Sequence, residues 1–94
     1  MARLGKKLRT SGDHGLMFYC PACKTTHGIR IGRNGWQWNE NQNEPTFTPS
    51  LMSIAGDLRC HCFVRDGAIE YLSDSTHAMK GQIVPMPDWP FSDA

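Results

Sequence analysis

The sequence predicts a mostly β, small, zinc-stapled single domain in the style of zinc ribbons, with a central β-hairpin and little helix. Three observations lead to this class: short β-favouring runs between turn residues, no long segment of helical periodicity, and four cysteines in two clusters. The 94 residues, with nine Gly and six Pro, suffice for one domain with a small core. A bound metal ion would add the stability that such a core lacks.

Charge is divided unevenly along the chain. Residues 1–12 contain four basic residues and no acid, a local charge of +4, so the rest of a chain with net charge +1 carries −3. This split predicts a flexible basic N-terminal tail over residues 1–15 and a zinc-binding β domain over residues 16–94. Such a tail could contact the phosphates of a nucleic acid.

Several short extended segments follow the basic region. Residues 16–20 and 28–32 are predicted as strands, and period-two spacing places Trp36 and Trp38 on one face of a third. Residues 46–56 contain a proline, which favours an edge strand or an ordered loop. The sequence therefore predicts a set of short strands rather than helices.

The clearest element is a hairpin around the Asp-Gly dipeptide at residues 66–67, which a two-residue type I′ turn prefers. Counting outward from this turn pairs Cys62 with Tyr71. It also places Cys60 and Cys62 on one face of the strand and His61 on the other, because side chains alternate along a strand.

The first cysteine pair, Cys20 and Cys23, lies in the motif Cys-Pro-Ala-Cys. A redox role would require a helix after the second cysteine, but Lys-Thr-Thr-His-Gly follows, with β-branched residues and a glycine. A zinc knuckle requires a tight turn between strands, and this sequence fits one. The cluster at residues 60–62 supplies further ligands.

The fourth ligand is predicted to be His77. Two same-face positions on one flat strand lie about 6–7 Å apart at Cα, so Cys60 and Cys62 reach one ion only if the strand bends. His77 lies beyond the hairpin, where the chain can fold back. We therefore predict a Zn²⁺ site of Cys20, Cys23, Cys60 and His77, with Cys62 and His61 as alternates for the fourth ligand.

A second polar group consists of His61, Asp74 and His77. Two imidazoles and a carboxylate can hold a catalytic metal or act as general acid and base. The structural alternative is that Asp74 pairs with Arg59 or caps a short helical turn. His27 is expected just outside the metal, hydrogen-bonded to a sulfur, or at the surface. The known nucleophile and phosphate-loop motifs are absent from the sequence, and we assign no catalytic residue from it.

The order of the motifs CPAC, WQWN, PTFTPSL, CHCFVRDG, DSTH and GQIV resembles a family of short phage and prophage proteins that genome annotation often labels "ammonia monooxygenase". The resemblance covers about residues 18–89 and implies a phage-encoded, metal-binding small protein. The enzyme of that label is a membrane complex, whereas this chain has no apolar run near the ~20 residues that a span requires. The family pattern matches Cys20, Cys23, His27, Cys60, His61, Asp74 and His77.

Together these observations predict a binding or adaptor module that acts on a host or phage protein, in host takeover or anti-defence. One alternative is a metal-dependent hydrolase that uses His61, Asp74 and His77. Another is a nucleic-acid-binding zinc-ribbon protein that uses the basic tail. No signal peptide or membrane span is predicted, so the expected location is the host cytoplasm, where thiols stay reduced.

Overall fold

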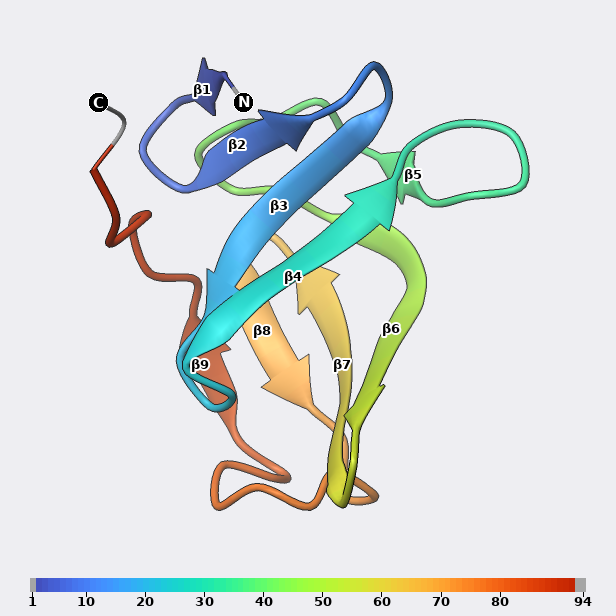
Figure 1. Ribbon diagram of the computed structural model, residues 1–94, viewed down its shortest axis with the longest axis vertical. Helices are drawn as coiled ribbons and strands as arrows, with labels where there is room; N and C mark the ends of the chain where they lie inside the picture. Colours follow the sequence, from blue (N-terminus) through green and yellow to red (C-terminus); the bar gives the residue numbers. More distant parts are fainter. Residues whose placement is uncertain (1, 93–94) are drawn as a thin grey trace.

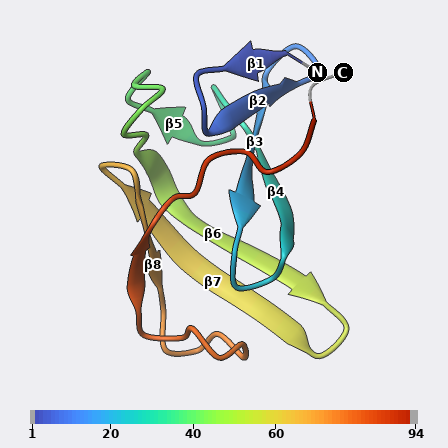
Figure 2. The same ribbon diagram turned by 90° about the vertical axis from the view of Figure 1, so that its left-hand side faces the viewer.

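A computed structural model describes residues 2–92 as two antiparallel β-sheets that face each other (Figures 1 and 2). The first sheet has the order β1 (Arg3–Leu4), β2 (Leu8–Ser11), β3 (Gly15–Cys20), β4 (Thr25–Arg30). The second has the order β5 (Gln37–Trp38), β6 (Phe47–Ala55), β7 (Leu58–Arg65), β8 (Ala68–Tyr71), β9 (Ile83–Pro85). The predicted β class is confirmed. Among the described residues there is no helix able to cross a membrane.

The core lies between the two sheets because alternate residues of the central strands point inward. In β3 the buried residues are Leu16, Phe18 and Cys20, and their neighbours are half-buried. The rings of Phe18 and Phe47 stack across the interface with centroids 6.2 Å apart. The cysteines Cys20, Cys60 and Cys62 belong to this same buried cluster.

The N-terminal segment differs from the flexible tail expected over residues 1–15. Residues 3–11 contain β1 and β2, and Leu8 is fully buried in the core. The guanidinium of Arg9 is also buried and lies 5.3 Å from the centre of the Trp89 ring. Composition alone suggested a solvated basic tail because the partner of Arg9 lies about eighty residues away in the sequence.

Two tight hairpins connect the long strands of the second sheet. In the turn between β7 and β8, Asp66 and Gly67 have φ angles of 50° and 79°, as a type I′ turn requires, and the predicted pairing of Cys62 with Tyr71 is confirmed. The β6–β7 turn is the dipeptide at residues 56–57. These hairpins place β7 at the centre of the sheet, between β6 and β8.

Candidate active site and metal cluster

Three polar side chains meet on the outer face of the second sheet. Nε2 of His61 lies 3.1 Å from Oγ of Ser50, and Nδ1 of His61 lies 3.0 and 3.1 Å from the two carboxylate oxygens of Asp74. His61 comes from β7, Ser50 from β6, and Asp74 from the loop after β8. The three residues therefore form a continuous Ser–His–Asp hydrogen-bond chain.

A β-bulge places Ser50 beside His61. Phe47 pairs with Val64 and Leu51 pairs with Cys62, so three residues of β6 lie opposite a single residue of β7. A bulge changes the direction of the side chains within it. Leu51 points into the core, and Ser50 points outward on the same face as His61.

The buried side chain of Ser75 holds the backbone of His61 on its other side. Its Oγ accepts a hydrogen bond from the His61 N–H at 3.0 Å and donates one to the His61 carbonyl at 3.1 Å. The N–H of Leu72 also donates to that carbonyl, at 2.8 Å. The loop that carries Asp74 is thereby fixed against β7, and the Asp74–His61 contact is fixed with it.

When His61 is neutral, only one of its tautomers can form both hydrogen bonds of the Ser–His–Asp chain. A carboxylate only accepts hydrogen bonds, so Nδ1 of His61 carries the proton and donates to Asp74. Nε2 is then free to accept the hydroxyl proton of Ser50. This is the arrangement in which histidine acts as a general base for a serine nucleophile.

A second cluster lies on the inner face, between the two sheets. One donor atom from each of Cys20, Cys23, His27 and Cys60 falls within 4.8 Å of the other three. The Cys20 and Cys60 sulfurs are 3.9 Å apart, close to the ~3.8 Å that two 2.3 Å bonds to a tetrahedral zinc imply. The four residues could therefore hold a metal ion, and they would link β3 and β4 to β7.

The chemistry of these side chains also fits a metal ion. Nε2 of His27 is buried and has no hydrogen-bond partner among the described residues. The contact with Cys60, together with burial, raises the pKa of Cys20 to about 11 in the metal-free protein. A cation would satisfy the orphaned imidazole nitrogen and stabilise the thiolates that burial otherwise disfavours.

The structure brings three of the four predicted ligands together, with His27 beside them where His77 was expected. The ring of His77 packs edge-on against Tyr71, with centroids 4.6 Å apart, and its Nδ1 accepts a hydrogen bond from the Met79 N–H. Cys62 is buried on the same face as Cys60 but lies outside the cluster. Of the predicted polar group, His61 and Asp74 are in contact with each other, and His77 takes no part in that contact.

Sequence reasoning missed Ser50, although a signal for it exists. Gly56 has a φ angle of 60°, which suits the first central position of a type II′ hairpin turn. Counting back from a hairpin at residues 56–57 pairs Met52 with His61. Ser50 lies two residues before Met52 and therefore on the same outward face of β6. The proline at position 49 favoured an edge strand or loop, so this hairpin was not used to set a register.

Residues 3–72 match the family model of BubE, described as a bacterial ubiquitination-like system serine protease. The match includes Ser50, His61 and the whole Cys/His cluster, and it ends shortly before Asp74. No curated protein and no solved structure gives a significant match. The matched segment covers well over half of this chain, and the chain therefore belongs to the BubE family.

Proposed function

We propose that this chain is a serine protease of a bacterial ubiquitination-like system, with Ser50 as the nucleophile. His61 is the general base, and Asp74 orients it. The observation that carries the proposal is the pair of hydrogen bonds from His61, 3.1 Å to Ser50 and 3.0 Å to Asp74. The description of the family as a serine protease supports it.

The geometry supports hydrolysis through an acyl-enzyme. The Ser50 hydroxyl attacks the carbonyl carbon of a peptide bond while Nε2 of His61 takes its proton. His61 then gives this proton to the leaving amine, and an ester on Ser50 remains. His61 next deprotonates a water molecule, which hydrolyses the ester and restores the Ser50 hydroxyl. Asp74 stabilises the imidazolium that forms in each half-reaction.

For the inner cluster we propose zinc, held by three cysteines and one histidine. This ligand set is typical of structural zinc sites, in which four protein ligands leave no open position for water. Bound there, zinc would join the two sheets and would supply no nucleophile. The proposal thus differs from the metal-dependent hydrolase considered from the sequence, because Ser50 supplies the nucleophile. The predicted phage origin and protein partner stay predictions.

A fluorophosphonate probe tests the active site without knowledge of the substrate. We expect one covalent adduct per chain, located on Ser50 by peptide mass spectrometry, because the probe reacts with serines activated by a histidine. Ser50→Ala should remove the adduct. Ser11→Ala, at an exposed serine in β2, is the matched control and should be labelled like wild type. An adduct on another serine, or none in folded protein, would refute the proposed function.

The fourth zinc ligand can be identified by comparing His27→Ala with His77→Ala. We expect His27→Ala to lose most of its zinc, since the His27 imidazole lies within the cluster. His77→Ala should keep one zinc per chain and lose some stability, because its ring packs on Tyr71. Elemental analysis of the two purified variants measures this. Zinc retained in His27→Ala and lost from His77→Ala would restore the ligand set predicted from the sequence.

A further inference from the structure

The strand that carries Ser50 has an open edge. On one side β6 pairs with β7 along most of its length, but on the other side β5 covers only Phe47 and Thr48. The ladder on the β5 side ends at Thr48. Two residues further on, the Ser50 carbonyl accepts a side-chain hydrogen bond from Trp36 Nε1 at 3.3 Å. Beyond Ser50, the edge faces a groove instead of another strand.

The turn at the end of β6 determines which backbone groups point into this groove. Ala55 and Leu58 flank a two-residue turn and therefore exchange both ladder hydrogen bonds. Hydrogen-bonded and non-hydrogen-bonded pairs alternate along an antiparallel ladder. The pairs of Met52 with His61 and of Ile54 with Arg59 are then non-hydrogen-bonded.

The partners on β7 agree with this assignment. The N–H of His61 donates to Ser75, and the carbonyl of Arg59 accepts from Thr76, so both point away from β6. Met52 and Ile54 must therefore direct their N–H and C=O groups to the open edge. In the described part of the chain these groups have no hydrogen-bond partner. Their spacing of two residues is the repeat that an added strand requires.

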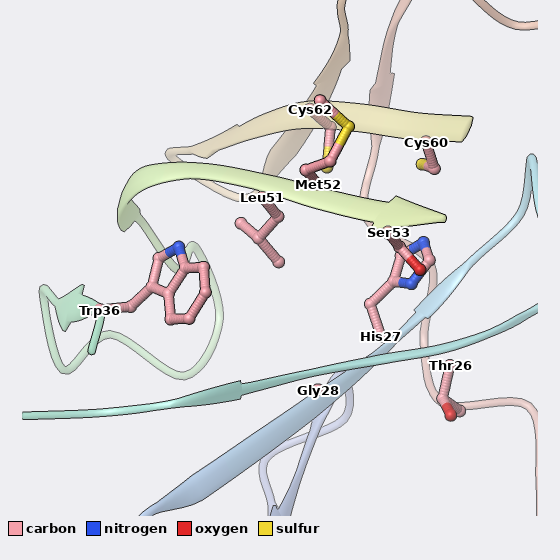
Figure 3. A pocket seen from close by; sticks show the side chains of 9 residues that line it. All are labelled: Thr26, His27, Gly28, Trp36, Leu51, Met52, Ser53, Cys60 and Cys62. Carbon is pink, nitrogen blue, oxygen red and sulfur yellow. The ribbon is translucent and has the colours of Figure 1, made fainter. Parts of the chain in front are cut away.

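A groove of about 180 Å³ runs along this edge. Figure 3 shows it between β6 and β4, with Trp36 at one end and the His27 and Cys60 side chains of the metal cluster at the other. Ser50 does not line the groove, but its carbonyl is hydrogen-bonded to Trp36. Thr26 and Gly28 of β4 form the opposite wall. The β6 segment from Ser50 to Ala55 has no charged residue, and Met52 and Ile54 are 48% and 63% exposed.

From these observations we infer that the β6 edge is the substrate-binding strand, and that the protease takes an extended segment of its protein substrate by β-strand addition. The inference rests on the proposed function, because Ser50 supplies the reaction at the end of the edge. The substrate main chain pairs with Met52 and Ile54, which presents its next carbonyl to Ser50. Because the edge is uncharged, recognition depends on an unfolded, uncharged segment rather than on an ionic contact.

The test compares two reagents on Ser50. An alkyl fluorophosphonate reports on the triad alone, and acetyl-tetra-alanine diphenyl phosphonate also requires the peptide main chain to bind. We expect Met52→Pro to lower the ratio of peptidyl to alkyl labelling rates by about three- to tenfold, the worth of one or two main-chain hydrogen bonds. A proline at this position removes the outward N–H and keeps the ladder to β7.

The matched control is Ile83→Pro on β9. The N–H of Tyr71 donates a hydrogen bond to the carbonyl of Gln82. Because hydrogen-bonded and non-hydrogen-bonded pairs alternate, the next residue, Ile83, directs its N–H away from β8, toward the other edge of the sheet. Its labelling ratio should equal that of wild type. Ile54→Pro, at the next edge-facing residue, repeats the test if Met52→Pro melts below the assay temperature.

Three outcomes would overturn the inference. The first is that neither labelling rate changes in a folded edge-proline variant. The second is an equal loss with both reagents, which would place the effect in the chemistry at Ser50. The third is unprotected Met52 and Ile54 amides in hydrogen exchange of the peptidyl adduct. If neither reagent labels wild-type protein, the proposed function fails, and the inference fails with it. If wild-type protein is labelled but one of the three outcomes above is found, only the inference fails.

Discussion

Alanine at Ser50 or at His61 is expected to lower kcat for peptide hydrolysis by a factor on the order of 10⁴–10⁶. The reason is that serine and histidine act as one unit, so the nucleophile is inactive without its base. The double variant should be no slower than the more damaged single variant. The measurement uses a peptide selected from a random library by mass spectrometry, with kcat and KM determined separately.

Asp74→Asn extends this test to the third residue. The asparagine keeps the shape of the side chain but can donate a hydrogen bond, which favours the wrong tautomer of His61. We expect kcat to fall by a factor on the order of 10⁴, with KM little changed. Asp57→Asn, at an exposed aspartate in the β6–β7 turn, is the matched control and should keep wild-type kcat.

The pattern of these losses distinguishes the triad from independent roles. If the Ser50 and His61 effects multiply in the double variant, the two residues do not act together. If kcat falls less than tenfold in Asp74→Asn, then Asp74 is a surface partner of His61 and has no orienting role.

The sequence contained enough information for the β7–β8 hairpin and for three members of the metal cluster. An Asp-Gly turn with alternating residues determines a register by local geometry alone. His27 could have been added by the same rule, because it alternates with Ile29, and both point into the core. The strand over residues 25–30 begins earlier than predicted and includes His27, which was expected just outside the metal or at the surface.

Two features depended on contacts that local patterns do not contain. The burial of Arg9 requires Trp89, and the position of Ser50 requires a bulge whose extra residues lie opposite a single residue of β7. A strand pattern gives the face of a residue but not the register of an irregular pair. His61 and Asp74 could therefore be grouped from the sequence. For Ser50, the hairpin at residues 56–57 predicts the outward face of β6, but the bulge beside it has no sequence signal.

The Cys60-His61-Cys62 segment connects the metal cluster to the active site, and it leads to the prediction with the largest effect on stability. Alternation along β7 directs Cys60 to the cluster and His61 to Ser50 from adjacent positions of one strand. Loss of the metal should therefore displace the strand that holds the general base. We expect Cys60→Ala to lose zinc and more than about 4 kcal/mol of unfolding free energy.

Cys62→Ser is the matched control, since Cys62 is equally buried on the same strand face but lies outside the cluster. It should keep one zinc per chain and wild-type kcat, at a cost of about 1–2 kcal/mol for a buried hydroxyl. Unfolding followed by circular dichroism, with zinc content by elemental analysis, measures both variants. Loss of zinc from Cys62→Ser with retention in Cys60→Ala would show that the neighbouring thiolate is the ligand.

Chelation of the wild-type protein separates a structural ion from a catalytic one. Zinc binding displaces the thiol proton of Cys20, whose pKa is raised to about 11 in the metal-free protein. Protons therefore compete with the ion, and zinc affinity and the stability that it provides should fall as pH is lowered from 8 to 6. Activity should disappear together with the folded state and return with one equivalent of zinc. Activity lost on chelation while the melting transition stays unchanged would instead place the ion in the reaction and contradict a closed four-ligand site.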